Sequence, residues 1–432
     1  MIEVYVKRGL NGWASFEFFV RKLPEKRNFL VAAGLEQVMM YLEGLRFGIE
    51  ELSYLKEIGF SQDLLDYLAK FSFVGDVWAM PEGTIFFANE PILRVEAPLP
   101  QAQLVETRII NILHFQILIA SKAIRVTLAA RGKPLLDFGL RRSHEASAGL
   151  LASRACYIGG FSGTATVEAG RAYGIPVTGT MAHSFVLAHG SEEAAFRSFI
   201  DMHPQKAILL IDTFDTLKCA RLVTRLYHEY LKKGIRIKGV RIDSGDLFEL
   251  SRRVRKIFDQ EGCNELLIFV SGGLDETKIN NLVASGAPID GFGVGTLVDT
   301  SADAPFLDCA YKMVEYERAP RMKYSTGKKT LPYRKQVFRC FDRKGLFESD
   351  VITTMDENIP SAKPLLVRVM KRGKRIYQDN LREIRKRTIC SQQKLPPGLR
   401  DINNRVEYHP EIRGRLNRIF SNQPFSDNCP ES

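Results

Sequence analysis

The chain has 432 residues, 45% hydrophobic and 26% charged, which is the composition of a globular protein with enough core for about two or three domains. No run of about eighteen apolar residues occurs and the start, MIEVYVKRGLNGW, lacks the apolar core of a secretory signal, so neither a membrane span nor a signal peptide is predicted. Seven scattered cysteines without a CxxC pair argue against a zinc site and predict a reduced, cytoplasmic protein, while a net charge of +11 favours anionic partners.

Residues 1 to about 125 mix predicted strands with predicted helices. The strands lie in ASFEFFVRKL and GTIFFANEPILRVEA, and the helices lie in LEQVMMYLEGL and LVETRIINILHFQILIASKAI. The second helix is apolar almost all round, so it is predicted to be deeply buried. The segment APLPQAQ in front of it is predicted to be a turn marked by its prolines.

Residues 126–304 alternate between short apolar runs and helical patterns. The predicted strands are LLDF, ACYIGGF, IPVT, AILLID, IKGVRID, LLIFVSG and IDGFGVG. The predicted helices are TVEAGRAYG, SEEAAFRSFIDMH, DTLKCARLVTRLYHEYLKKG, DLFELSRRVRKIFDQEG and DETKINNLVASG, with Gly234, Gly262 and Gly286 where helix C-caps belong. This alternation predicts a parallel sheet, and the lack of a GxGxxG motif after the first strand favours an α/β barrel over an open doubly wound sheet.

After residue 305 short strands return, in AYKMVEY, RKQVFRCF, ESDVITT and PLLVRVM. The predicted fold class is α/β: an irregular α/β barrel over residues 126–304 and a second, β-rich α+β domain built from both chain ends, residues 1–125 and 305–432. Basic residues gather near the C-terminus, where LREIRKR has helical spacing. We interpret this run as a solvated helix face, and no nucleic-acid partner is expected, because no RNA-binding motif or aromatic stacking pattern accompanies it.

Polar residues follow almost every predicted strand of the middle zone. In an α/β barrel the carboxyl ends of the strands open onto one face, so these residues are expected to meet at one mouth. They are Phe138 to Arg142, Ser162 to Thr164, His183 in GTMAHSF, Asp212, Arg241 and Asp243, Ser271 to Gly273, and Gly293 to Thr296. A lone histidine is usually structural, but the polar residues expected around His183 favour a functional role for it.

These groups suit an anionic ligand that contains a sugar. The SGG and GVGT turns expose backbone N–H groups that bind phosphate. Arg141, Arg142 and Arg241 supply guanidinium groups for a carboxylate or pyrophosphate. Asp212 and Asp243 could bind ribose hydroxyls, hold Mg²⁺ or orient an imidazole, and Asp243 could instead cap a helix. A histidine beside an aspartate acts as an acid/base or accepts a phosphoryl group.

The motifs DFGLRR, GFSGT, GTMAHSF, LLIDTFDT, GVRIDSGD, SGGLDE and GFGVGT, in this order and spacing, resemble those of nicotinate phosphoribosyltransferases over nearly the whole chain. Those enzymes are type II phosphoribosyltransferases with an α/β barrel and a β-rich second domain. The resemblance implies ATP-coupled synthesis of nicotinate mononucleotide and pyrophosphate from nicotinate and phosphoribosyl pyrophosphate, a step of NAD biosynthesis and salvage. It also implies Mg²⁺, ATP as co-substrate, and a cytoplasmic homodimer with active sites at the subunit interface.

The resemblance further implies roles for single residues. It makes His183 a phosphohistidine with Asp212 as its acidic partner, and it places ribose hydroxyls on Asp243. Phe138 stacks on the pyridine ring and Arg241 binds the ring's carboxylate. The other predicted substrate-binding residues are Arg141 on the pyrophosphate side, Ser271, Gly273, Gly295 and Thr296 around the 5′-phosphate, and Thr180, Ser184, Gly272 and Gly293. No metal ligand is assigned.

Several alternatives stay open from the sequence. The close relative that acts on nicotinamide has an aspartate at the position of Ala165, directly after GFSGT. A carboxylate there would repel nicotinate, so Ala165 favours the acid over the amide. Quinolinate phosphoribosyltransferase shares the barrel but is shorter and needs more basic residues for two ring carboxylates. A basic RNA-associated non-enzymatic protein and a catalytically silent scaffold dimer are the remaining alternatives.

One departure from the family pattern lies at the start of the chain. The family usually begins with a stretch like DLYQLTM, whose tyrosine completes the ring stack across the dimer, whereas Met1 aligns with the end of that motif. We expect either that the sequence starts late or that the aromatic clamp is incomplete and nicotinate affinity is reduced. Tyr5 lies in a different position, so the role is not assigned to it.

Overall fold

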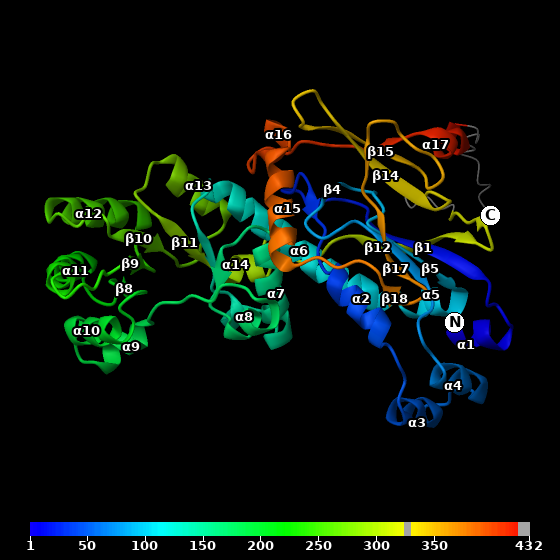
Figure 1. Cartoon of the computed structure of the whole chain (residues 1–432), viewed down its shortest axis with the longest axis horizontal. Coiled ribbons are helices and arrows are strands. Elements are labelled where there is room, and N and C mark those ends of the chain that lie inside the picture. Colours follow the sequence, from blue (N-terminus) through cyan, green and yellow to red (C-terminus); the bar gives the residue numbers. More distant parts are fainter. Residues whose placement is uncertain (324–329, 422–432) are drawn as a thin grey trace, which may run out of the picture. The chain divides into compact units, whose positions relative to one another are not determined.

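The structure, a computed structural model, describes residues 1–323 and 330–421; residues 422–432 at the end of the predicted β-rich domain, with Cys429, lie outside the described residues. The chain divides into two compact units (Figure 1). Unit 1 consists of Met1–Leu118 and Phe306–Ser432, and unit 2 consists of Ile119–Pro305. The predicted fold class, α/β with a separate β-rich part, is confirmed.

Unit 1 is built around a seven-stranded antiparallel sheet. In spatial order its strands are β13 (Ala319–Pro320), β12 (Cys309–Tyr316), β1 (Trp13–Val20), β5 (Leu93–Pro98), β3 (Asp76–Ala79), β17 (Val367–Lys371) and β18 (Lys374–Arg375). β1 and β12 pair along nearly their full length, from Ala14 opposite Tyr316 to Val20 opposite Cys309. The sheet therefore joins strands from both ends of the chain.

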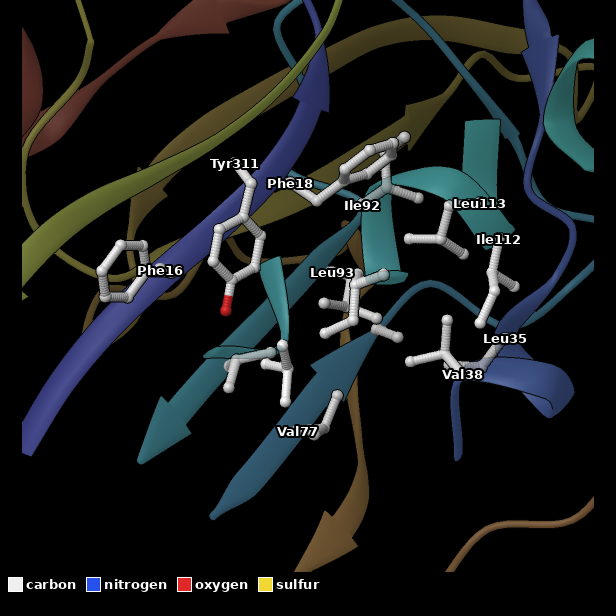
Figure 2. Packing of buried hydrophobic residues seen from close by; sticks show 14 of the residues in the cluster. Phe16, Phe18, Leu35, Val38, Val77, Ile92, Leu93, Ile112, Leu113 and Tyr311 are labelled. Atoms are coloured by element: carbon white, nitrogen blue, oxygen red, sulfur yellow. The ribbon is translucent and has the colours of Figure 1, made fainter. Parts of the chain in front are cut away.

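Side chains of this sheet and of the helix that follows β2 form the core of unit 1. Figure 2 shows Phe16 of β1 beside Tyr311 of β12, and their ring centroids lie 5.1 Å apart in a stacked arrangement. Leu35 and Val38, one helical turn apart on α2 (Leu35–Gly44), belong to the same buried cluster. Burying one such side chain contributes about 1.5–3 kcal/mol, so the apolar stripe of LEQVMMYLEGL holds this helix on the sheet.

Smaller sheets and short helices complete unit 1. A four-stranded sheet has the order β16 (Lys363–Pro364), β14 (Lys335–Phe341), β15 (Phe347–Thr354) and β19 (Glu411–Ile412), and β2 (Leu30–Val31) pairs with β4 (Ile85–Phe86). The other helices are α1 (Ile2–Lys7), α3 (Ile49–Glu57), α4 (Gln62–Ala69), α5 (Leu99–Leu104), α15 (Leu381–Gln393), α16 (Pro397–Arg400) and α17 (Gly414–Ser421). The turn predicted at APLPQAQ is wrong, because α5 begins there with Pro100 in its first turn, where the missing N–H of proline costs no hydrogen bond.

The basic run LREIRKR begins α15, as predicted, but only part of it is a solvated face. The guanidinium of Arg387 lies 2.7 Å from the carboxylate of Asp379 and donates to the carbonyl of Glu82 at 2.6 Å. Arg382 is exposed. At least one arginine of the cluster therefore holds the helix in place.

The apolar helix predicted to be buried is α6 (Glu106–Ala130). Within the described parts of the chain, it is the one helix long and apolar enough, by length and composition alone, to cross a membrane. However, 78% of its most apolar stretch is buried inside the protein, which is the environment of a core helix in a soluble protein. The prediction of deep burial is confirmed.

Unit 2 contains a six-stranded parallel sheet. The strand order is β7 (Gly163–Thr164), β6 (Leu135–Asp137), β11 (Gly291–Val294), β10 (Leu267–Val270), β9 (Gly239–Ile242) and β8 (Ile208–Leu210). In chain order, β6 is the first strand of this sheet and β11 is the last, and the two pair with each other, as the first and last strands do in a barrel. Across unit 2, which is described throughout, no ladder joins β8 to the β7 edge, so the sheet is a curled half-barrel rather than a closed one.

Helices connect these strands. They are α7 (Ala146–Ile158), α8 (Val167–Tyr173), α9 (His183–Ala188), α10 (Glu192–Met202), α11 (Thr216–Leu231), α12 (Leu247–Gln260), α13 (Glu276–Ala284), α14 (Thr296–Asp299) and the short 3₁₀ turn η1 (Leu140–Arg142). In Figure 1, α11 and α12 lie on the outer side of β8, β9 and β10. Gly234, Gly262 and Gly286 have φ of 74°, 68° and 70°, as expected for glycines that end helices.

Two predicted strands are wrong. The residues ACYI form the last turn of α7, and in IPVT only Val177 makes a bridge, to Thr164. A short apolar run does not distinguish a strand from a buried helix, because both bury every side chain. As a consequence His183 begins helix α9 instead of following a strand.

Candidate active site

A cavity of about 610 Å³ opens at the carboxyl ends of the strands of unit 2. Of the residues given a catalytic or binding role, all line it except Asp212 and Ser184, whereas Ser162, Gly163 and Thr164, also expected at the mouth, do not line it. The lining residues from that set are Phe138, Arg141, Thr180, His183, Arg241, Asp243, Ser271, Gly272, Gly273, Gly293, Gly295 and Thr296. Asp212 contacts His183, and Ser184 is exposed outside the cavity, so its binding role stays a prediction.

His183 is held in one orientation by a buried carboxylate. Its Nε2 lies 3.2 Å from Oδ1 of Asp212, whose side chain is only 2% exposed. The other oxygen of Asp212 accepts hydrogen bonds from the Ser244 hydroxyl at 2.6 Å and from the Asp243 N–H at 3.0 Å. Since Asp212 is fixed on both oxygens, it turns Nε2 of the imidazole toward itself and leaves Nδ1 without a partner among the described residues.

Arg241, on β9, is held by three protein acceptors. Its Nη1 lies 3.2 Å from Oδ1 of Asp243 and donates to the Ser271 hydroxyl at 3.1 Å, and Nη2 donates to the Met181 carbonyl at 2.9 Å. The Nε atom is buried and has no hydrogen-bond partner in the described parts of the chain. Burial lowers the pKa of Arg241, and the carboxylates of Asp243 and Asp212 oppose that shift. An arginine does not deprotonate in proteins, so a cation lines the cavity.

Two glycine turns bring the backbone close to the cavity. In the SGG turn, Gly272 has φ of 97°, and a Cβ there would lie 2.0 Å from the carbonyl oxygen of Asp243. In the GVGT turn, a Cβ on Gly295 would lie 2.8 Å from the carbonyl oxygen of Phe138. Only glycine fits at these positions, and turns of this kind present backbone N–H groups to an anion.

An aromatic ring and a small side chain complete the cavity wall. Phe138 follows β6 directly, and its N–H donates to the Val294 carbonyl at 2.7 Å. The guanidinium of Arg241 lies 6.0 Å from the Phe138 ring centroid. Ala165 lines the same cavity and is exposed to it. The space between these groups suits a flat aromatic ligand with a negative charge.

Two further residues of the motifs also build the site. Ser244 holds Asp212, and the guanidinium of Arg142 lies 3.4 Å from the hydroxyl of Thr296. Arg142 is part of DFGLRR and Ser244 is part of GVRIDSGD, so the motifs themselves carried the signal for both. The Met181 carbonyl that accepts from Arg241 is backbone, and no side-chain pattern reveals it.

The residues present do not form a protein cage for a metal ion. Residues 1–323 and 330–421 contain no group of three His, Cys, Asp or Glu side chains that could hold one. Asp243 is the one carboxylate among the cavity-lining residues, all of which are described. This donor set fits Mg²⁺ only if substrate phosphates supply most of the ligands, which is how Mg²⁺ commonly binds in enzymes.

Comparison with known proteins gives the family. The model of the nicotinate phosphoribosyltransferase N-terminal domain matches residues 1–114, and the model of the nicotinate phosphoribosyltransferase family matches residues 134–338. The nicotinate phosphoribosyltransferase pncB2 of Mycobacterium tuberculosis is 45% identical over 430 residues, which cover 97% of this chain and 91% of that relative. This chain belongs to the nicotinate phosphoribosyltransferase family. The nicotinate phosphoribosyltransferase of Bacillus subtilis is 39% identical over 94% of this chain and 86% of its own length.

A solved structure agrees with this family. The crystal structure of human nicotinic acid phosphoribosyltransferase matches 98% of each chain with a TM-score of 0.86 and 26% identity. The resemblance inferred from the motifs is confirmed, and the chain is a phosphoribosyltransferase of NAD biosynthesis. The nicotinamide and RNA-associated alternatives are not favoured for a member of the nicotinate phosphoribosyltransferase family.

Proposed function

We propose that the chain transfers the phosphoribosyl group of phosphoribosyl pyrophosphate to nicotinate and that ATP hydrolysis is coupled to this transfer. The products are nicotinate mononucleotide and pyrophosphate, and ATP and water give ADP and phosphate. The observation that carries the proposal is the meeting, in one cavity, of an aspartate-held histidine, the guanidinium of Arg241, and two glycine turns. These groups suit a phosphoryl group, a carboxylate and a phosphate, respectively.

Phe138 and Arg241 would position nicotinate. The ring stacks on Phe138, and the carboxylate pairs with the guanidinium of Arg241, which lines the cavity. The pyridine nitrogen is a weak nucleophile, so its alignment with C1 of the ribose is the main contribution that the protein can make. The new N–C1 bond forms while the C1–O bond to pyrophosphate breaks, and the electron pair of that bond leaves with pyrophosphate.

The leaving charge needs electrostatic stabilisation. Arg141 lies at the cavity and supplies one positive charge, and the SGG and GVGT turns bind the 5′-phosphate that anchors the donor. Asp243 would hold the ribose hydroxyls and serve as the protein carboxylate for Mg²⁺ held by pyrophosphate oxygens. When bound, Mg²⁺ would supply Lewis-acid stabilisation of the leaving group.

His183 would accept the γ-phosphoryl group of ATP. Because Asp212 occupies Nε2, we assign the new N–P bond to Nδ1, with ADP as the leaving group and water later releasing phosphate. The two additional negative charges at the cavity edge would reposition the arginines around the donor. His183 phosphorylation thereby couples ATP to tighter donor binding.

We also propose a cytoplasmic homodimer with shared active sites. Val167, Leu187 and Phe214 are 71%, 59% and 66% exposed, and each follows a site residue by a few positions. Large apolar side chains exposed on the segments that carry site residues are candidates for a protein interface. All six cysteines in the described residues are unpaired thiols, which suits a reducing compartment.

Pyrophosphate release tests the reaction. With phosphoribosyl pyrophosphate and Mg²⁺ present, nicotinate should give turnover that ATP accelerates, whereas nicotinamide should give little, because only nicotinate carries the charge that Arg241 binds. The measurement compares the two acceptors, each with and without ATP. Faster release with nicotinamide would contradict the assigned substrate.

Ala165→Asp should shift the preference from nicotinate toward nicotinamide. A carboxylate on the cavity wall repels the carboxylate of nicotinate, and kcat/KM for nicotinate should fall by about tenfold or more. Ala165→Asn is the matched control, since it has nearly the same size and no charge. An equal loss in both variants would mean that volume, and not charge, sets the preference.

A further inference from the structure

Two acidic residues lie buried directly beneath the cavity wall of unit 2. Asp137 is the last residue of β6 and is 1% exposed, and Asp299 is the last residue of α14 and is 2% exposed. In the described parts of the chain neither of them makes an ion pair with Lys or Arg. Buried carboxylates without a cation are costly, so this pair needs a physical explanation.

Asp137 has the surroundings of an ionised carboxylate. Its Oδ1 accepts the N–H of Gly139 at 2.8 Å, and its Oδ2 accepts the hydroxyls of Ser153 and Thr164, each at 2.7 Å. All three neighbours donate. A carboxylate that accepts three hydrogen bonds is stabilised in its charged form even without a cation.

Asp299 has the surroundings of a neutral acid. One strong donor reaches it, the Ser143 hydroxyl at 2.8 Å from Oδ2, and the Cys156 thiol lies 3.8 Å from Oδ1. Burial first, and the charge of Asp137 second, raise the pKa of Asp299 well above its usual value. The two carboxyls therefore carry one negative charge between them, because no cation among the described residues offsets a second buried charge of the same sign.

The pair touches all three segments that would hold nicotinate and the 5′-phosphate. The carboxyl of Asp299 packs on Gly139, where an added Cβ would lie 2.2 Å from its Cγ. Gly139 follows Phe138, and Asp299 ends the helix that Thr296 begins. The Ala165 N–H donates to the backbone carbonyl of Asp137 at 2.9 Å. A displacement of the two carboxyls would therefore move Phe138, Ala165 and Thr296 together.

We propose that Asp137 and Asp299 are positioning residues that share one proton, with the charge on Asp137 and the neutral acid at Asp299, and that this pair sets the relative placement of Phe138, Ala165 and Thr296. The effect on catalysis rests on the proposed function, since that function gives the three residues their roles. The location of the proton does not rest on it.

The proposal predicts unequal effects of similar substitutions. Asp137→Asn replaces a carboxylate that accepts three hydrogen bonds by an amide with one oxygen. The N–H₂ group of the amide must then face a hydrogen-bond donor. We expect kcat/KM to fall on the order of 100-fold. Asp299→Ala removes the contact to Ser143 and Gly139 and should also lose activity. Asp299→Asn keeps the shape and the neutral charge, so it should restore kcat/KM to within about threefold of wild type.

Steady-state kinetics distinguish positioning from a general loss of structure. In Asp137→Asn, the KM values for nicotinate and phosphoribosyl pyrophosphate should rise together, with the unfolding midpoint lowered but a cooperative transition retained. Asp246→Asn is the matched control, since Asp246 caps α12, lies outside the cavity lining, and Asn caps helices as well as Asp does. It should leave both KM values unchanged.

Infrared spectroscopy of protein labelled with ¹³C-aspartate tests the proton directly and requires no turnover. The wild type should show the carbonyl band of a buried protonated aspartic acid, and Asp299→Asn should remove it. Three results would overturn the proposal. The first is a wild type without this band, and the second is a band that is lost in Asp137→Asn but kept in Asp299→Asn. The third is an equal loss of activity in both Asn variants. If the wild type shows no nicotinate-dependent turnover, the proposed function fails while the band still decides where the proton lies.

Discussion

His183→Ala should remove the phosphoenzyme and the stimulation by ATP while leaving a slow turnover that does not depend on ATP. Coupling between two ligands is typically worth roughly 5- to 150-fold, and this factor should fall to about one in the variant. The reason is that the substitution takes away Nδ1, the acceptor we assign to the phosphoryl group, but leaves Phe138, Arg241 and the glycine turns in place. Transfer with radiolabelled ATP measures the phosphoenzyme, and pyrophosphate release measures turnover.

Two further variants make this result specific. His203→Ala removes a histidine of the same unit that packs against Phe199 and lies outside the cavity lining, so it should keep the full ATP effect. Asp212→Asn keeps the shape but loses the charge that orients the ring, so phosphorylation should slow while the cavity remains. An undiminished ATP effect in His183→Ala would rule out the phosphohistidine.

Much of this site could be predicted because its chemistry follows strand ends. Arg241 lies near the end of strand β9, and Asp243 and the glycine turns come at or directly after strand ends, so the barrel rule predicted that they meet at one mouth. His183 was predicted to follow a strand, whereas it begins helix α9. Its assignment to the site therefore depended on the surrounding motif, GTMAHSF.

Other parts lie beyond what a sequence can reveal. The contact between Asp299 and Gly139 joins positions far apart in the chain, and nothing local marks Asp299 as different from any acidic residue at a helix end. ACYIGGF was misassigned because a helix buried on all sides has the same apolar run as a buried strand. Tertiary packing decides both cases, and single-sequence periodicity does not contain it.

Arg339→Met should destabilise unit 1 by about 3–5 kcal/mol, the usual result of removing one partner of a buried ion pair. Arg339 on β14 lies opposite Asp350 on β15, its Nε is 2.8 Å from Oδ1, and its Nη2 is 2.5 Å from Oδ2. The two side chains are 3% and 0% exposed. Glu90 is buried beside them, and its pKa is raised well above the usual value, by burial first and by Asp350 second.

The loss should depend on pH in a definite direction. A carboxyl whose folded pKa lies above its unfolded value of about 4.5 stabilises the fold at low pH and loses that contribution as pH rises toward the folded value. Without Arg339, Asp350 joins Glu90 as a buried acid without a cation. The stability of Arg339→Met should therefore be closer to that of the wild type near pH 5 than near pH 8.

Tryptophan fluorescence during urea unfolding reports on the unfolding of unit 1, because both tryptophans, Trp13 and Trp78, lie in its large sheet. Arg413→Met is the matched control, since Arg413 pairs with Glu411 at the surface, and it should cost less than about 1 kcal/mol. Asp350→Asn should cost less than Arg339→Met, because Glu90 remains as a carboxylate for Arg339. A loss in Arg339→Met as small as in Arg413→Met, or one that grows toward low pH, would show that Arg339 does not neutralise these buried acids.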